Sequence, residues 1–85
     1  INLLDFRTKE EFSAGHIITA KNLSLDDIEK VSLKSDNPYV AYADTDTDAL
    51  KAATMFSKLG IQKIFYLEGG IKSWIENNMP LTGED

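Results

Sequence analysis

The sequence predicts an α/β protein in which a small, mainly parallel sheet lies between two layers of helices. Three observations lead to this class. Short apolar runs, suited to buried strands, alternate with segments whose apolar residues recur at helical spacing. Glycine, proline and helix-capping residues separate these segments. Strands that alternate with helices pair in parallel through right-handed crossovers, which places helices on both faces of the sheet.

The composition is that of a globular domain. Of the 85 residues, 42% are hydrophobic and 27% are charged, which is too apolar for a disordered segment. A chain of this size forms one core and buries only about 60 to 65% of its unfolded surface. We therefore expect a single domain over residues 1–85.

The first elements are a strand and a short helix. Ile1–Arg7 is an apolar run that ends in charge and is too short for a helix, which favours a buried strand. Thr8 and Glu11 form a capping-box pattern, which predicts a helix that ends at Gly15.

The middle of the chain predicts two helices around a central strand. Residues 24–31 carry an apolar residue at every third position, which indicates a second short helix, and residues 32–38 are polar, as in a loop. Tyr39–Ala43 is apolar and aromatic, as in a central strand. Asp48–Leu59 is the longest predicted helix, and Gly60 ends it. The expected apolar face of this helix consists of Leu50, Ala53, Met55, Phe56 and Leu59.

The last elements are a strand, a tight turn and a helix. Ile61–Leu67 is an apolar strand, Gly69 and Gly70 form the turn, and Ile71–Asn78 is a helix that ends before Pro80. In parallel sheets of this kind, ligands bind beyond the carboxyl ends of the strands. The segment to inspect for function is therefore 43–49, which follows the central strand.

Charge and hydropathy exclude several classes of partner. The 9 Lys and Arg residues against 14 Asp and Glu residues give a net charge of -5, with no basic stripe for a nucleic acid or an anionic membrane surface. No apolar run is long enough to span a bilayer, and the first residues do not resemble a secretory signal. We expect a soluble, cytoplasmic protein without nucleic-acid or membrane partners.

Four motifs occur in the order and spacing of the rhodanese-like family. They are Leu3–Arg7, Glu11-Phe12 with Gly15-His16-Ile17, the strand, loop and helix of Tyr39–Leu59, and Tyr66–Ile71 with Trp74. The chain therefore resembles a rhodanese-like domain almost from end to end, which implies a three-layer α/β/α fold. Ile18-Thr19 departs from the family's Pro-Gly, and the family's N-terminal strand is absent. We therefore expect that the chain lacks that strand or is cut from a longer protein.

The resemblance implies a degenerate active site. The family moves sulfane sulfur through a persulfide on a cysteine, held in a six-residue loop between the central strand and the next helix. This chain contains no cysteine, and the matching position is Ala43, which has no nucleophilic atom. The residues that follow Ala43 are Asp44, Thr45, Asp46, Thr47, Asp48 and Ala49.

The three aspartates of this loop also oppose binding of an anion. A carboxylate about 6 Å from a bound anion repels it by roughly 2 to 3 kcal/mol at an effective dielectric constant of ~20. A helix N-terminus returns only about 0.3 to 1 kcal/mol. Thiosulfate, phosphate and persulfide are therefore expected to be excluded.

Simpler interpretations apply to most of the polar residues. Asp44, Asp46 and Asp48 copy the first ligands of a calcium loop, but its glycine position is Ala49 and its glutamate position is Met55. We therefore expect no cofactor and no metal, with these aspartates as a weak candidate site. The simpler interpretation is that Asp48 or Thr47 caps the helix.

Structural roles are expected for the remaining residues of the motifs. A lone histidine forms neither a metal cluster nor a nucleophile-base pair, and a buried acid is normally paired with a base. The residues assigned such roles are Asp5, Arg7, His16, Gly69, Gly70 and Trp74. The aromatic and methionine residues predicted to form the core are Met55, Phe56, Phe65, Tyr66 and Trp74.

These observations favour a catalytically inactive rhodanese-like module that acts as an interaction, scaffold or regulatory domain. Its partner is an unknown protein or another domain of its parent chain, and Asp44–Asp48 is the expected contact surface. One alternative is that this loop binds a divalent cation or a cationic ligand. Another is a sulfurtransferase by resemblance alone, in spite of the missing nucleophile.

Overall fold

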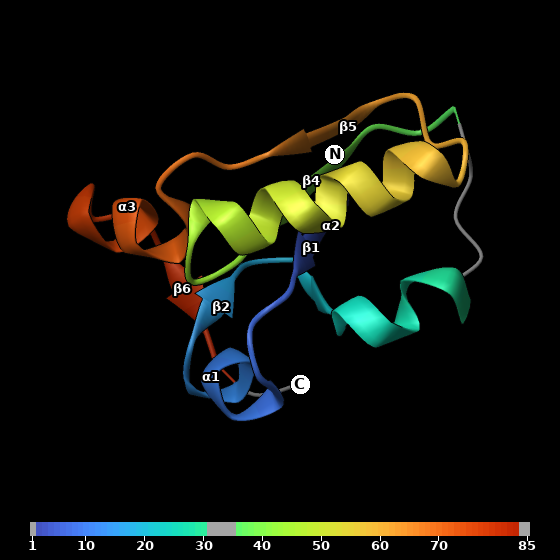
Figure 1. Ribbon diagram of the computed structural model, residues 1–85. Helices are drawn as coiled ribbons and strands as arrows, with labels where there is room; N and C mark the ends of the chain where they lie inside the picture. The colour runs from blue at the N-terminus through green and yellow to red at the C-terminus, as the bar shows by residue number, and fades with distance from the viewer. Residues whose placement is uncertain (1, 31–35, 84–85) are drawn as a thin grey trace.

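The computed structural model describes residues 2–30 and 36–83, and its centre is a sheet of four parallel strands (Figure 1). The strands are β1 (Asn2–Asp5), β3 (Lys21–Asn22), β4 (Tyr39–Tyr42) and β5 (Ile64–Tyr66), in the order β3-β1-β4-β5. β2 (His16–Ile17) and β6 (Leu81–Thr82) form a separate antiparallel pair. The parallel pairing of the main sheet confirms the sequence prediction.

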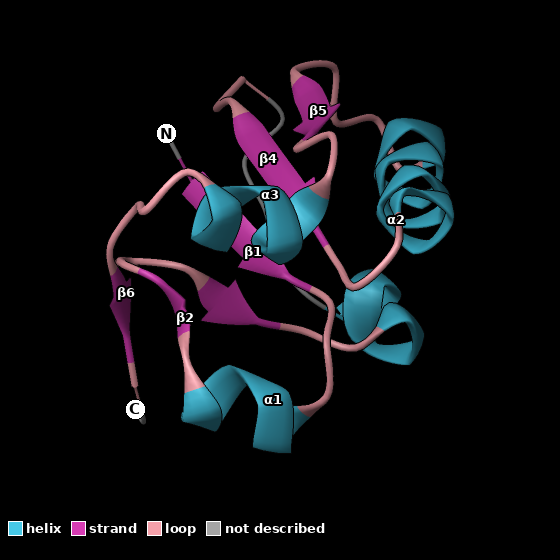
Figure 2. Ribbon diagram, turned by 90° about the vertical axis from the view of Figure 1, so that its left-hand side faces the viewer, coloured by secondary structure: helices cyan, strands magenta, loops and turns pink. Residues whose placement is uncertain are grey.

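Helices cover both faces of this sheet. The helical elements are α1 (Lys9–Ala14), the 3₁₀ helix η1 (Leu25–Lys30), α2 (Asp46–Lys58) and α3 (Gly70–Glu76). Figure 2 shows α2 and η1 together on one side of the main sheet, with α1 and α3 away from them. The expected three-layer α/β/α arrangement is therefore confirmed.

The core consists of two clusters, one on each face of the sheet. The cluster beneath α2 and η1 contains Leu4, Ile28, Tyr39, Ala41, Ala52, Phe56 and Ile61. The cluster on the side of α1 and α3 contains Phe12, Ile17, Ala20, Tyr42 and Ile71. Because successive strand residues point to opposite faces, the neighbours Ala41 and Tyr42 belong to different clusters.

The ends of α1 form as its sequence predicts. The Glu11 N–H donates to Thr8 Oγ1, and the Thr8 N–H donates to Glu11 Oε1, each over 3.1 Å. Gly15 follows the last helical residue, and its N–H donates to the carbonyls of Glu11 and Phe12. Both arms of the capping box are thus present, so local sequence is sufficient to define this helix.

The second predicted helix is η1, and it is a 3₁₀ helix. Apolar residues at every third position lie on one face of such a helix, because it has three residues per turn. Ile28, at the centre of this face, is fully buried. The predicted end at Val31, and residues 32–35 of the predicted loop, lie outside the described residues.

The predicted face and start of α2 were partly wrong. Leu50 and Leu59 are each 51% exposed, and the helix begins at Asp46 instead of Asp48. The buried stripe consists of Ala49, Ala52, Ala53 and Phe56, which are spaced three, four and seven residues apart. The alanines form this stripe because their short side chains let the helix lie close to the sheet.

The prediction that Phe65 and Tyr66 belong to the core was also wrong. Phe65 is 59% exposed and Tyr66 is 38% exposed, because they lie on β5, at an edge of the sheet. Phe56 is buried as predicted, and Met55 and Trp74 pack against the two clusters while partly exposed.

Three of the strands were not predicted. β2, β3 and β6 have two residues each, which is too short for an alternating pattern to be visible in the sequence. Between β2 and β3, Thr19 has φ 74°, in the left-handed region that glycine favours. Thr19 is the position at which the resemblance expects glycine, and it adopts a backbone conformation that glycine favours.

Candidate functional site

The carboxyl ends of β1 and β4 lie side by side and define the candidate site. Asp5 and Tyr42 are register partners at the ends of these strands, and the loop that begins at Ala43 leads directly into α2. Ala43 itself is only 1% exposed. Segment 43–49 thus lies at the edge of the sheet where parallel folds bind their ligands.

The start of α3 packs against this loop. Gly70 has φ 54°, and a Cβ atom placed there would collide with the carbonyl oxygen of Ala43. Gly69 has φ 80°, so both residues of the turn adopt the left-handed conformation. The two glycines therefore allow α3 to approach the backbone of the loop directly.

The helix cap of the loop is Thr45, so the interpretation that Asp48 or Thr47 caps α2 was wrong. Thr45 is extended, with φ -127° and ψ 152°, and its Oγ1 accepts a hydrogen bond from the Asp48 N–H over 3.2 Å. The cap falls earlier than predicted because Asp46 and Thr47 are already helical.

Asp46 ties the loop to the glycine turn. Its Oδ1 accepts a hydrogen bond from the Gly69 N–H over 2.9 Å. This backbone donor is thus occupied by a carboxylate of the chain itself. Asp46 is half-buried, whereas Asp44 and Asp48 are exposed.

A carboxyl group from another element joins the loop. The Glu11 side chain lies close enough to that of Asp44 for each to perturb the pKa of the other, so α1 and the loop share one acidic surface. Burial, and then Glu11, raise the pKa of Asp44 above its usual value. Hydrogen bonds from the backbone and side chain of Thr8 lower the pKa of Glu11. The sequence gives no signal for this pairing, because the two residues are far apart along the chain.

The acidic residues of the loop do not converge on one point. Over residues 2–30 and 36–83, no three His, Cys, Asp or Glu side chains are grouped as metal ligands. Asp46 is directed to Gly69, and Asp44 to Glu11. The weak candidate site of Asp44, Asp46 and Asp48 is therefore not assembled within these ranges.

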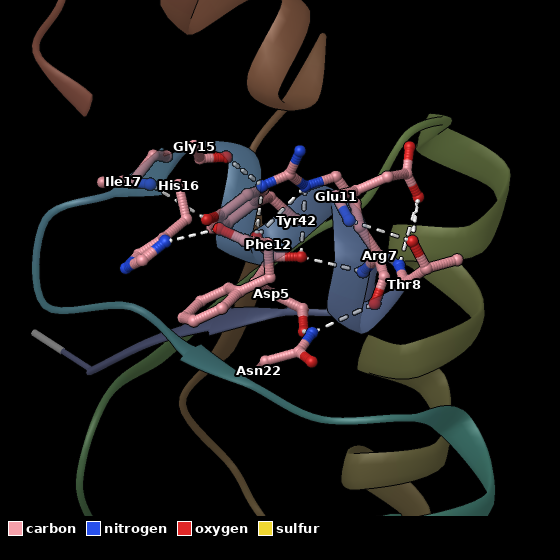
Figure 3. A network of polar contacts seen from close by, with 10 residues as sticks. All are labelled: Asp5, Arg7, Thr8, Glu11, Phe12, Gly15, His16, Ile17, Asn22 and Tyr42. Carbon is pink, nitrogen blue, oxygen red and sulfur yellow. Dashed lines mark hydrogen bonds and ion pairs between the residues drawn. The ribbon is translucent and has the colours of Figure 1, made fainter. Parts of the chain in front are cut away.

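Behind the loop lies a buried ion pair between Asp5 and Arg7 (Figure 3). The Asp5 side chain is fully buried, and that of Arg7 is 7% exposed. Arg7 Nη2 donates to Asp5 Oδ2 over 2.8 Å, and Arg7 Nε lies 3.2 and 3.1 Å from the two carboxylate oxygens. Arg7 Nη2 also donates to the Gly15 carbonyl over 2.6 Å. The guanidinium therefore joins β1 to the end of α1.

Tyr42 and Asn22 complete this network, although the sequence did not single them out. The Tyr42 ring lies 5.8 Å from the Arg7 guanidinium carbon, and its hydroxyl accepts a hydrogen bond from the Ile17 N–H over 3.1 Å. Burial, and then hydrogen bonding to Asp5, raise the pKa of Tyr42. Asn22 Nδ2 donates to the carbonyls of Asp5 and Arg7, each over 3.0 Å. The network thus connects β1, β3, β4 and the chain around β2.

His16 and Trp74 make contacts of a structural kind. The His16 ring is buried, stacks on Phe12 with centroids 3.6 Å apart, and has Nδ1 2.7 Å from the Phe12 carbonyl. Because a carbonyl only accepts, Nδ1 is the donor in this contact. Trp74 Nε1 donates to the Pro80 carbonyl over 2.7 Å, which holds the chain beyond α3.

Comparison with solved structures shows where this fold recurs. The Alr3790 protein from Anabaena sp. superposes with a TM-score of 0.93 at 23% identity, over 99% of this chain and 70% of that one. A rhodanese-related protein from Thermoplasma volcanium superposes with a TM-score of 0.87 at 29% identity, over 98% of this chain and 84% of that one. No helix of the described residues is both long and apolar enough to cross a membrane.

Relatives in sequence are themselves uncharacterized proteins. One from Buchnera aphidicola is 32% identical, with 94% of this chain matched to 57% of the relative. YqhL of Bacillus subtilis is 34% identical, with 85% of this chain matched to 59% of the relative. The chain thus spans less than two thirds of the length of these curated relatives. The family model for the rhodanese-like domain matches residues 1–77, so the chain belongs to the rhodanese-like family.

Proposed function

We propose that this chain is a catalytically inactive rhodanese-like module that binds a basic patch on a partner protein or on another domain of its parent chain. The contact surface is the acidic loop, Asp44–Asp48. The observation that carries the proposal is that exposed carboxylates follow Ala43, the position of the family's nucleophile, in a loop above the buried Asp5–Arg7 ion pair.

The residues at the catalytic position support the loss of sulfur transfer. The chain contains no cysteine, and Ala43 provides no atom that can carry a persulfide. The Gly69 N–H already donates to Asp46. Repulsion of roughly 2 to 3 kcal/mol from each carboxylate about 6 Å from a bound anion exceeds what a helix N-terminus returns.

Charge and exposure support the role as a contact surface. Asp44 and Asp48 are exposed, and Glu11 extends the same acidic surface from α1. Carboxylates in this position attract a basic partner and raise its rate of association. The fixed network beneath the loop presents them with little loss of entropy on binding.

Affinity capture from a lysate of the source organism tests this contact surface. The bait is compared with a variant in which Asp44, Asp46 and Asp48 are each changed to Asn. A matched control removes the same charge elsewhere, through Glu29→Gln, Asp36→Asn and Glu76→Gln, which are exposed positions. Circular dichroism verifies that all three proteins are folded.

A protein that the parent and the control retain and the loop variant loses supports the proposal, and raised salt is expected to release it. If the loop variant retains the same proteins as the parent, the loop is not the interface. Loss of catalysis is tested separately, by an assay of sulfur transfer from thiosulfate to cyanide. Turnover above that of buffer would overturn the inactive assignment.

A further inference from the structure

A groove with a volume of about 560 Å³ lies between α1 and the edge of the main sheet. Its lining residues are Lys9, Phe12, Ser13, Ala20, Lys21 and Asn22. None of these belongs to the acidic loop, so the groove is a different surface from the one proposed above. Its volume falls within the range of about 300 to 1,000 Å³ that is usual for ligand sites.

The charge of this groove is opposite to that of the chain as a whole. Lys9 and Lys21 are exposed on its two sides, and within the part of the chain that the structure describes neither forms an ion pair. The net charge of the chain is -5, so two ammonium groups that have no ion-pair partner among residues 2–30 and 36–83 form a local positive site on this groove. A ligand that complements it carries carboxylates.

The floor of the groove is apolar. Phe12 and Ala20 are 7% and 8% exposed and belong to the same core cluster. The Phe12 ring is stacked on His16, which fixes its position. A ligand that complements this floor carries an apolar side chain between its charged groups, so that burial contributes to affinity together with the ion pairs.

One wall of the groove is an open edge of the sheet. Lys21 and Asn22 form β3, which stands at the end of the strand order and, among the strands of residues 2–30 and 36–83, pairs with β1 alone. An edge strand presents backbone groups on its free side, and an extended peptide can add to them as a further strand. This wall favours an extended polypeptide over a compact small molecule.

We propose that the groove binds an extended acidic segment of another protein. The carboxylates of the segment pair with Lys9 and Lys21, and an apolar side chain between them contacts Phe12 and Ala20. The inference is independent of the proposed function, because the acidic loop selects a basic partner and this groove selects an acidic one.

Titration of the ¹⁵N-labelled chain with capped pentapeptides tests the inference by NMR. The probes have Glu at both ends and three residues of Val, Leu or Phe between, and the control peptides have Lys at both ends. The expected result is saturable shifts of backbone amides in residues 9–13 and 20–22 with the Glu peptides alone. If no Glu peptide shifts these amides at millimolar concentration, or if the Lys peptides shift them equally, the inference is overturned.

Charge reversal assigns the binding to the two lysines. Lys9→Glu combined with Lys21→Glu is expected to raise the dissociation constant by about ten-fold or more. The matched control, Lys51→Glu with Lys72→Glu, alters exposed lysines of α2 and α3 and is expected to change it by less than about two-fold. Equal weakening by both pairs would overturn the inference.

Two further variants separate folding and the acidic loop from this result. Lys9→Gln combined with Lys21→Gln is a milder change that also has to weaken binding if the inference is correct. The variant with Asn at positions 44, 46 and 48 is expected to bind the Glu peptides as the parent does. The result of affinity capture with this variant therefore tests the proposed function. Its binding of the Glu peptides tests the groove.

Discussion

The Asp5–Arg7 ion pair and segment 43–49 lie at the same end of the main sheet but differ in burial and in the pairing of their charges. The Asp5–Arg7 pair is buried, and its charged groups are hydrogen bonded to each other and to Gly15. Segment 43–49 lies directly above it and presents exposed carboxylates. At this end of the fold, the buried ion pair holds secondary-structure elements together, whereas segment 43–49 presents charged groups to solvent. Substitutions in segment 43–49 can therefore leave the ion pair unchanged.

The physical reason is the cost of burial. A charge removed from water needs a partner, so loss of either member of the Asp5–Arg7 pair leaves the other uncompensated. A charge that stays in water needs no partner, so exposed carboxylates can occupy the loop without a matching base. The family's chemistry can thus be lost from the loop while the network beneath it stays intact.

The largest expected effect is that of Arg7→Met. Removal of the guanidinium leaves Asp5 buried and charged, so the free energy of unfolding is expected to fall by about 3 to 5 kcal/mol. Urea unfolding followed by circular dichroism measures it. The control is Lys9→Met, an exposed change expected to stay within about 0.5 kcal/mol of the parent. A loss below about 1 kcal/mol for Arg7→Met would contradict the structural importance of the pair.

Substitution of Gly70 tests the contact between α3 and the loop. Gly70→Ala is expected to destabilise the fold by about 3 kcal/mol, because the left-handed backbone is strained and the new Cβ collides with the Ala43 carbonyl. Gly60→Ala is the matched control, since Gly60 has φ 95° but no atom within 4 Å of a Cβ placed there. Its expected cost is about 1 kcal/mol, from backbone strain alone. Equal costs in thermal unfolding would show that the collision is relieved.

A cysteine introduced at the catalytic position measures the electrostatics of the loop. With Ala43→Cys the thiol pKa is expected to lie above the ordinary value of about 8.5, because burial and the nearby carboxylates disfavour the thiolate. The rate of alkylation by iodoacetamide as a function of pH gives this pKa. Added changes of Asp44, Asp46 and Asp48 to Asn are expected to lower it by about one unit, or about 1.4 kcal/mol.

No sulfur transfer is expected from Ala43→Cys alone. A thiol pKa below about 7 in this single variant would show that the loop still stabilises an anion. The three aspartates would then not be what excludes an anion from the loop, and only the missing cysteine would separate this chain from sulfur transfer.

The smallest expected effect is the pH dependence of Asp44→Asn. The pKa of Asp44 is raised in the folded chain, so its charged form destabilises the fold above that pKa, and Asn relieves this at pH 7. The gain is expected to be under about 0.5 kcal/mol because the side chain is largely exposed. It disappears as the pH falls below the ordinary carboxyl value of 3.8, where Asp44 is protonated in both states.

Thermal unfolding midpoints at pH 7 and pH 3 test this dependence. The control is Asp26→Asn on η1, where no gain at pH 7 is expected. A lower midpoint for Asp44→Asn at pH 7 would show that the contact with Glu11 is favourable when both groups are charged, contrary to the assigned direction.

Local patterns were sufficient for part of the fold. The capping box of Thr8 and Glu11 predicted α1 correctly, because its donors and acceptors are three residues apart. The spacing of apolar residues located η1 and α2, although it selected Leu50 for the buried face in place of Ala49. A helical period identifies a helix more reliably than it identifies which of two adjacent residues faces the sheet.

Residues of the site that depend on distant partners were not predictable. Tyr42 accepts a hydrogen bond from Ile17, and Glu11 lies near Asp44, because the folded chain brings these elements together. The cap at Thr45 depends on where the β4 strand ends and α2 begins, so Asp48 and Thr47 were equally acceptable from sequence.

The sequence by itself determined the fold class, the family and the absence of a cysteine, because these depend on residue types and their order. Only the tertiary structure decided that Asp46 binds the Gly69 amide, that Glu11 joins the acidic surface and that Lys9 and Lys21 share a groove. Side chains far apart in the chain meet only after the crossovers of a parallel sheet align the ends of its strands. Charge at a site is therefore a property of the fold as much as of the composition.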